Sequence, residues 1–238
     1  NGLSKTNDLK DFCYFKLEAF KLKRYESILK KANAILAIQE EDQKHFKTIN
    51  SNTFSLPICY KENKDWSKKE TSRYLLFQGN LSVKENQYAI HWIIENVWVK
   101  LDYKLKFIVA GKNPSSDLKK TLKQHKIELV TNPKQTEMDK LIQEARIHLL
   151  YTNQPTGAKL KVINALQSNG HVLVNSALIE GTDLSILCHV CDTSKEFEEA
   201  IIELSKRELA NNDFQSRKNY FERNLNVAKN CKIIEEII

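Results

Sequence analysis

The stretch Arg73–Asn80, RYLLFQGN, decides the fold class of this chain of 238 residues. Its apolar run ends at Phe77 and is followed by a polar turn that contains Gly79. A continuous apolar run is typical of a strand that is covered on both faces. The next stretch, ENQYAIHWIIENVWVKL (85–101), has apolar residues on one helical face, namely Ile90, Ile93, Ile94 and Val97. Together the two stretches predict a strand that leads into a helix.

The same alternation recurs along the rest of the chain. Further strand-like runs are KLKFIVAG (104–111), IELV (127–130), RIHLLY (146–151), HVLVN (171–175) and LCHVC (187–191). Helix-like stretches lie at 116–125, 137–145 and 158–169, and two long ones, at 195–209 and 214–238, close the chain. Repeated alternation implies parallel strands joined by right-handed crossovers. We therefore predict an α/β fold with a doubly wound, Rossmann-like parallel sheet of about six strands.

The segment before Arg73 is organised differently. It contains a long basic helical stretch (11–31), a strand (32–39), a short helix (40–47), an extended piece (52–59) and a polar linker. Two strands cannot bury a core of their own. We expect this segment to rest on the main sheet or on further chain, and the first residue, Asn1 rather than Met, suggests that the numbering begins inside a longer product.

Composition narrows the class of protein. With 41% hydrophobic residues, 6 Gly and 4 Pro, the chain is not collagen-like, disordered or a disulfide scaffold. Its opening residues lack the apolar core of a signal peptide, so we expect a cytoplasmic protein. The net charge of +7 can indicate a polyanion partner, but lysines alternate with glutamates in KEFEEAIIELSKRE (195–208), as on a solvated helix. We expect no nucleic-acid partner, and a basic polyanion-binding protein remains an alternative.

Several residues that often carry chemistry are interpreted as structural. Five cysteines in a chain without a secretion signal indicate free thiols. Cys188 and Cys191 form a C-x-x-C, but no second ligand pair follows at zinc spacing, so we predict no metal site. His171 and His189 lie in apolar strand contexts and are predicted to be packed. The three tryptophans are predicted to pack in the core or linker, and they are Trp66, Trp92 and Trp98.

Two loops that follow predicted strands indicate an anion site. In FQGNLS (77–82), Gly79 allows close backbone approach and Lys84 can reach an anion. In PTGAKLK (155–161), backbone N–H groups before a helix favour phosphate and two lysines add charge. Loops after parallel strands open into one crevice. The pair predicts a diphosphate site, although a packing role for Gly79 and a simple N-cap role for Thr156 stay open.

These stretches resemble retaining GT-B glycosyltransferases of family four. TGAKLKVINALQSNGHVLVNSALIEGTDL (156–184) is similar to the family's donor-binding signature, and LLFQGNLSVKEN (75–86) to the first strand and glycine loop of its C-terminal domain. KFIVAGKNP (106–114) and KANAILAIQEEDQKHF (31–46) resemble a later strand and the segment before the interdomain linker. The four matches occur in the family's order and cover the chain from about Tyr25.

The resemblance implies roles for the matching positions. Lys161, which would neutralise the departing diphosphate, and Lys84 are the catalytic candidates. The implied donor-binding set is Gly79, Asn80, Gly111, Asn113, Thr131, Thr156, Gly157, Ala158, Lys159 and Asn164, with backbone at Thr131 and Asn132 lining the base. The family's two glutamates, eight positions apart, are replaced here by Thr156 and Asn164. Asn164 can still hydrogen-bond a ribose hydroxyl.

The resemblance also implies a function and a domain plan. The parent would be a mannosyl- or glucosyltransferase-like enzyme that moves a sugar, with retention, from a UDP or GDP sugar to a glycan or lipid-linked acceptor in polysaccharide or glycoconjugate synthesis. No cofactor or metal is implied. Residues 65–238 would be the donor-binding domain and 1–64 a remnant of the acceptor domain, with the helix 214–238 crossing back.

The resemblance has two further implications, one for the activity of the chain and one for membrane contact, and it leaves one alternative function open. The chain alone would be inactive, because the acceptor domain is incomplete. The basic helix Lys16–Lys31 would allow peripheral contact with an anionic surface, at the inner face of the cytoplasmic membrane. The alternative is a nucleotide-binding module without turnover. The replacement of the family's two glutamates by Thr156 and Asn164 favours this alternative.

Overall fold

A computed structural model describes residues 9–56, 66, 71–101, 105–154, 159–225, 227–235 and 237. The chain divides into two compact units: Asn1–Tyr60 together with Leu225–Ile238, and Lys61–Asn224. The interpretation of the smaller unit as the remnant of an acceptor domain stays a prediction.

The larger unit is built around one parallel sheet of six strands. The strands are β3 (Ser72–Asn80), β4 (Lys106–Lys112), β5 (Glu128–Thr131), β6 (Ala145–Leu149), β7 (His171–Val174) and β8 (His189–Val190). Their order is β5-β4-β3-β6-β7-β8. The chain therefore moves outward from β3 to β5 on one side and then from β6 to β8 on the other. The predicted doubly wound α/β sheet is confirmed.

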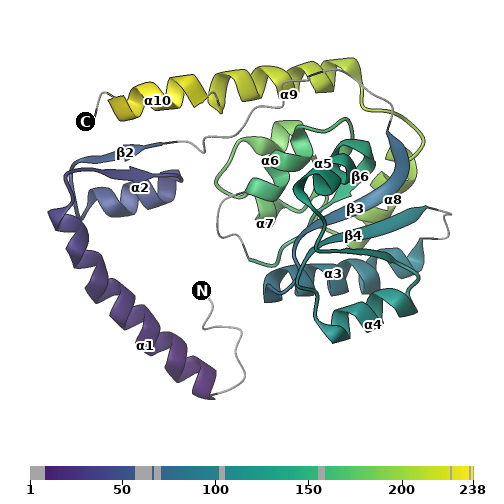
Figure 1. The fold of residues 1–238 in the computed structure, drawn as a ribbon, viewed down its shortest axis with the longest axis horizontal. Coiled ribbons are helices and arrows are strands. Elements are labelled where there is room, and N and C mark those ends of the chain that lie inside the picture. The colour runs from purple at the N-terminus through teal and green to yellow at the C-terminus, as the bar shows by residue number, and fades with distance from the viewer. Residues whose placement is uncertain are drawn as a thin grey trace. The chain divides into compact units, whose positions relative to one another are not determined.

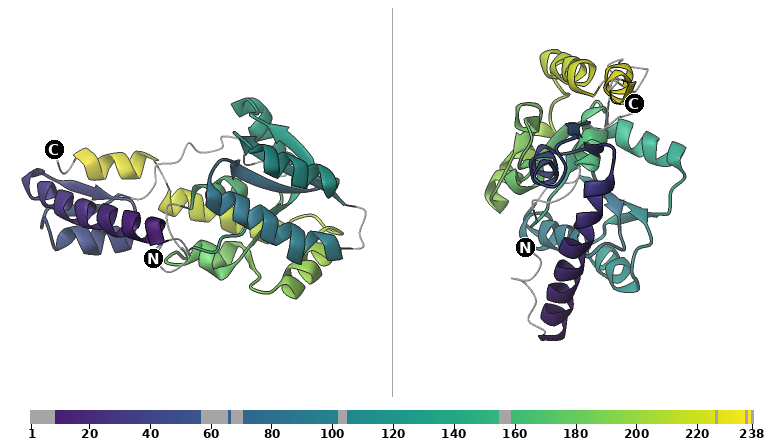
Figure 2. Two further views of the ribbon diagram at one scale, coloured as in Figure 1. Left: turned by 90° about the horizontal axis from the view of Figure 1, so that it is seen from below. Right: turned by 90° about the vertical axis from the view of Figure 1, so that its left-hand side faces the viewer.

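Helices cover both faces of this sheet (Figures 1 and 2). The helices of this unit are α3 (Lys84–Asn96), η3 (Trp98–Lys100), α4 (Ser116–Gln124), α5 (Gln135–Glu144), α6 (Leu160–Leu166), α7 (Ser176–Ile179), η4 (Leu184–Leu187), α8 (Ser194–Leu204) and α9 (Asn211–Asn224). The short elements α7 and η4 were not predicted, because four residues are too few for a periodic pattern. The predicted helix 158–169 is shorter, since α6 begins at Leu160 and ends at Leu166.

The unbroken apolar run of β3 supplies two cores at once. Leu75 and Phe77 are fully buried in the cluster that contains α3, α4 and α8 side chains. Tyr74 and Leu76 face the opposite way, into a cluster with Ile142 of α5. Successive side chains of a strand point to opposite faces. The run that indicated a strand covered on both faces is therefore explained by two helical layers.

The smaller unit contains a short strand–helix–strand repeat. Strands β1 (Ile35–Ala37) and β2 (Thr53–Ser55) pair in parallel and are joined by α2 (Glu40–Lys47). The predicted helix 11–31 is α1 (Leu9–Tyr25) followed by a 3-10 helix, η2 (Glu26–Lys31). Within the described ranges, no helix is both long and apolar enough to cross a membrane.

The predicted helix 214–238 is two helices, α9 and α10 (Val227–Glu235). Asparagines occur at 224 and 226, and asparagine is a weak helix former. The residues from Leu225 onward group with the smaller unit, whereas α9 groups with the larger one.

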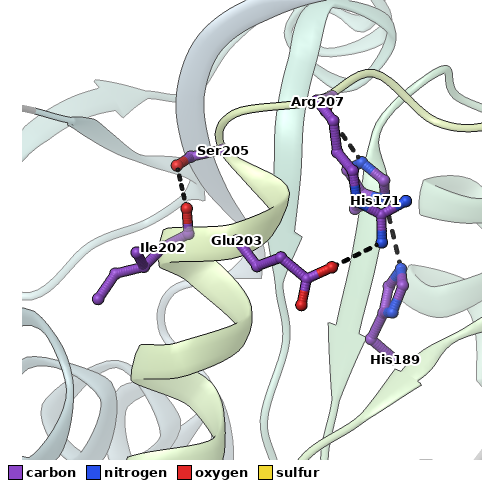
Figure 3. Close-up of polar contacts among 6 residues, drawn as sticks. All are labelled: His171, His189, Ile202, Glu203, Ser205 and Arg207. Atoms are coloured by element: carbon purple, nitrogen blue, oxygen red, sulfur yellow. Dashed lines mark hydrogen bonds and ion pairs between the residues drawn. The ribbon is translucent and has the colours of Figure 1, made fainter.

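A partly buried polar network lies at the amino ends of β7 and β8 (Figure 3). His171 Nδ1 lies 3.3 Å from His189 Nε2, and His171 Nε2 lies 3.2 Å from the carbonyl oxygen of Arg207. Arg217 of α9, itself fully buried, donates to the carbonyl of Gly170 at 2.7 Å. As expected from their apolar contexts, both histidines are packed and hydrogen-bonded. They lie at the end of the sheet opposite to the predicted crevice.

Acid is expected to destabilise the larger unit through its buried histidines. Burial first, and then the charge of Arg217, lowers the pKa of His148 to about 3, and burial lowers that of His171 to about 4. Both values lie below the unfolded pKa of about 6.5. The unfolded state therefore binds more protons, and stability that is present above that value is lost as pH falls toward the folded pKa. We expect a loss of about 2 kcal/mol per histidine between about pH 7.5 and about pH 5.

Urea denaturation at the two pH values measures this loss. The variant His148→Asn keeps a polar side chain near Ser168 Oγ, which lies 2.8 Å from His148 Nε2, but cannot titrate. Its stability should depend less on pH than that of the unaltered chain. Equal pH dependence of the two proteins would contradict the assignment to His148.

Candidate functional site

The sheet reverses its winding between β3 and β6, and the candidate site lies at the carboxyl ends of these strands. In open α/β sheets a crevice forms at this point. The register pairs Gly79 with Gly111, and Gly111 with Thr131. Three of the predicted residues thus form one row across β3, β4 and β5, although they lie far apart in the sequence.

Close packing of β3 against β4 explains the glycine at 111. A Cβ atom added to Gly111 would lie 1.9 Å from the carbonyl oxygen of Gly79 and 2.8 Å from the Leu81 side chain. The backbone of the two strands leaves no space for any side chain there. The close pairing of the two strands therefore requires glycine at 111, and the predicted contact of Gly111 with a nucleotide stays a prediction.

Two asparagines tie the loops after β4 and β5 together. Asn113 and Asn132 have positive φ angles of 54° and 50°, which asparagine tolerates better than most residues. The N–H of Asn113 donates to Asn132 Oδ1 at 2.8 Å, and the N–H of Asn132 donates to the carbonyl of Gly111 at 2.9 Å. The side chain of Asn132, which the sequence interpretation left unassigned, holds the predicted nucleotide-bordering residue Asn113 in place.

The chain that leaves β6 is held by β7 and by α3. Asn175, after β7, accepts from the N–H of Thr152 at 3.0 Å and donates to its carbonyl at 2.7 Å. The Tyr151 ring stacks on Trp92 of α3, with centroids 4.0 Å apart and an interplanar angle of 4°. These contacts orient the chain just before Pro155. The predicted residues Thr156, Gly157 and Ala158 lie outside the described residues.

Lys161 is the predicted catalytic residue with the most defined surroundings. Its Nζ donates to Asn86 Oδ1 at 3.1 Å and lies 5.7 Å from the centre of the Phe77 ring. Burial lowers the pKa of Lys161 to about 8, and the nearby Lys159 ammonium acts in the same direction. Burial also lowers the pKa of Lys159, which Glu180 partly offsets. Lys159 is therefore near enough for its positive charge to affect the pKa of Lys161, and Glu180 offsets only part of the effect of burial on Lys159.

The remaining predicted residues are more dispersed. Asn80 ends β3, and its Oδ1 accepts from the N–H and hydroxyl of Ser82 at 3.2 and 2.9 Å. Lys84 is exposed at the first residue of α3, and Asn164 is half-buried on α6. The end of β3 and the turn that follows it, residues 79–83, are called the β3 loop. The structure brings Lys161 to this loop through Asn86, whereas no contact joins Lys84 to Lys161 among the described interactions.

Asn86 was missed by the sequence interpretation. Its Nδ2 donates to the carbonyl of Asn80 at 2.9 Å, and its Oδ1 accepts from Lys161. The residue lies at the end of the stretch LLFQGNLSVKEN, so its proximity to the glycine loop was visible. Its partner on α6 was not, since 75 residues separate the two.

The cysteines and acidic residues contribute no site in the part of the chain that the structure describes. No group of three or more His, Cys, Asp or Glu side chains is placed there to hold a metal ion. Cys188 and Cys191 are free thiols, and burial raises their pKa values to about 12 and about 11. Thiols with raised pKa values are poor nucleophiles at neutral pH.

Residues 72–207, more than half of the chain, match the model of the family described as glycosyl transferases group 1. No curated protein sequence matches the chain.

Solved structures with a similar fold are glycosyltransferases that share little sequence with the chain. TarM from S. aureus, solved as a point mutant in complex with Fondaparinux, alpha-GlcNAc-glycerol and UDP, has a TM-score of 0.66 at 14% identity, over 91% of this chain and 46% of TarM. A glycosyltransferase from Rickettsia africae has a TM-score of 0.63 at 13% identity, over 90% of this chain and 66% of the other. Alr3699/HepE from Anabaena, in complex with UDP-glucose, has 0.59 at 11% identity, over 86% and 63%. At these identities the likeness concerns the fold, and the chain spans about half to two thirds of their lengths.

Proposed function

Because this chain belongs to the glycosyl transferases group 1 family, we propose that its crevice binds the nucleotide-sugar donor of a glycosyltransferase. The larger unit is then the donor-binding half of a GT-B fold. The observation that carries the proposal is the convergence of Lys161 on the β3 loop, at the point where the sheet reverses its winding. Phosphate groups are the ligands that suit two lysines and a glycine loop at this place.

The donor would lie across the carboxyl ends of four neighbouring strands, β5, β4, β3 and β6. Its diphosphate would contact Gly79 and Asn80 on one side and Lys159 and Lys161 on the other. Its base would lie toward Asn113 and Thr131, where the tied loops after β4 and β5 leave both residues exposed. The side chain of Asn164 would hydrogen-bond a ribose hydroxyl of the donor.

Lys161 would assist the departure of the nucleoside diphosphate. Negative charge develops on the leaving group as the glycosidic bond breaks, and a preorganised cation stabilises that charge. With a pKa of about 8, Lys161 is mostly protonated at neutral pH, and a bound diphosphate would favour its charged form further. Lysines would neutralise the charge of the departing diphosphate, and no cofactor is proposed.

We also propose an acceptor for the reaction. The sugar would be transferred, with retention, to a glycan or lipid-linked acceptor, and a domain of which the smaller unit is one part would hold that acceptor. TarM and HepE were solved with UDP or UDP-glucose, so uridine diphosphate is the first probe to use. A nucleotide-binding module without turnover is the second candidate, since Thr156 and Asn164 replace two glutamates of the family pattern.

A thermal-shift comparison tests donor binding. UDP at a hundredfold excess over its Kd should stabilise the chain by about 2.7 kcal/mol. For a domain of this size that corresponds to a rise of about 5–10 °C in Tm. ADP, which carries the same diphosphate, is the control for unspecific attraction to the basic surface. If UDP, GDP and their sugars leave Tm unchanged, both the enzyme and the binding-module proposals are wrong.

A further inference from the structure

Asn86 connects two parts of the crevice that are distant in sequence. It is the third residue of α3, and its side chain reaches back toward the end of β3. The amide group donates from Nδ2 to the carbonyl of Asn80 at 2.9 Å and accepts at Oδ1 from Lys161 Nζ at 3.1 Å. One side chain thus joins the β3 loop to α6.

We propose that Asn86 is a positioning residue that holds the Lys161 ammonium beside the β3 loop, where the donor diphosphate binds. The inference rests on the proposed function for the identity of the anion. The placement of Lys161 by Asn86 rests on the hydrogen bonds alone.

The chemistry of this position calls for an amide. A carbonyl oxygen on one side needs a donor, and an ammonium on the other needs an acceptor, and a carboxamide supplies both at once. Aspartate would place a negative oxygen against the Asn80 carbonyl. It would also neutralise Lys161 and compete with the incoming diphosphate. Asparagine orients the lysine and leaves its charge for the ligand.

The glycine at 79 provides independent support. A Cβ atom added there would lie 3.0 Å from Asn86 Nδ2, which is closer than ordinary contact. The absence of a side chain on Gly79 therefore makes room for the Asn86 amide. This steric relation gives the glycine loop a function besides contact with the phosphates.

The surroundings of Lys161 contain no carboxylate that would replace the diphosphate among the described residues that act on it. Asn86 faces it from α3 and Phe77 from β3, and both are neutral. Lys159, from the start of the same helix, is positive and disfavours the charged form of Lys161. A bound dianion would satisfy both lysines.

Three variants separate positioning from general stability. Asn86→Ala removes both hydrogen bonds, and Asn86→Asp adds a charge beside Lys161. Gln87→Ala is the matched control, because Gln87 follows directly on α3 and donates from Nε2 to the carbonyl of Leu81 at 2.8 Å without contacting Lys161. Calorimetry with UDP and with uridine measures the effect on phosphate binding separately from the effect on base binding.

We expect Asn86→Ala to weaken UDP binding about tenfold, as for a lost hydrogen bond to a charged group, and to leave uridine binding unchanged. Gln87→Ala should change either affinity less than about twofold. Competitive acetylation of Lys161, followed by mass spectrometry over a range of pH, reads its titration without nucleotide. Asn86→Asp should raise the pKa of Lys161, and Asn86→Ala should lower it.

The outcomes distinguish the inference from the proposed function. UDP binding with equal losses in Asn86→Ala and Gln87→Ala, or a Lys161 titration that neither Asn86 variant changes, overturns the inference and leaves the donor site standing. If the unaltered chain binds neither UDP nor GDP nor their sugars, the proposed function is wrong, and the acetylation profile still decides whether Asn86 holds Lys161.

Discussion

Replacing Lys161 by methionine is expected to weaken UDP binding about 100-fold, because removing one partner of a buried, hydrogen-bonded charge pair costs about 2–5 kcal/mol. Methionine keeps much of the length of the side chain but removes the ammonium that lies over the Phe77 ring and that Asn86 orients. Affinity for uridine, which lacks phosphate, should stay within about twofold. Calorimetric titration with both ligands measures the difference.

The control for Lys161→Met is Lys123→Met. Lys123 is an exposed lysine in the last turn of α4, which leads toward the amino end of β5, and the variant makes the same change in net charge at the other end of the sheet. If both variants lose the same affinity for UDP, the effect reflects the overall positive charge. The role proposed for Lys161 would then be wrong.

Gly111→Ala is expected to destabilise the larger unit by about 4 kcal/mol, at the upper end of single substitutions. The added Cβ would lie 1.9 Å from the Gly79 carbonyl oxygen, and the two strands that must separate are central in the sheet. Such strain cannot be relieved by a rotamer change, because the obstacle is backbone. Urea denaturation measures the loss of stability.

Gly181→Ala is the comparison for this substitution. Gly181 has a φ of 73° and nothing within 4 Å of an added Cβ, so alanine meets conformational strain there without a clash. Its cost should be about 1 kcal/mol. If Gly111→Ala costs no more than Gly181→Ala, the sheet adapts at this place and the steric argument for Gly111 fails.

The strands were predictable from sequence because each is a short apolar run between polar turns. Leu75 and Leu76 are both apolar since the two faces of β3 are both covered, and a run of this kind identifies a central parallel strand without knowledge of its neighbours. The helix α7 and the break between α9 and α10 were not predicted. Both involve only a few residues, fewer than the roughly 11–18 residues over which a helical pattern is recognised.

The candidate site was only partly accessible from sequence. Gly79 and Lys161 were predicted because a glycine at the end of a strand and a lysine at the start of a helix are local patterns. Asn86, Asn175 and the side chain of Asn132 were missed, although each makes a hydrogen bond to a loop near the carboxyl ends of the strands. Asparagine on the surface of a helix or in a loop carries no local sign of its partner.

The sequence by itself determined the α/β class and the order of strands and helices along the chain. Tertiary structure alone decided that Gly79 lies beside Gly111, and that Lys161 meets Asn86 across 75 residues of chain. The physical reason is that periodicity and turn chemistry act over a few residues. Strand register and side-chain hydrogen bonds between distant segments depend on how the two helical layers pack on the sheet.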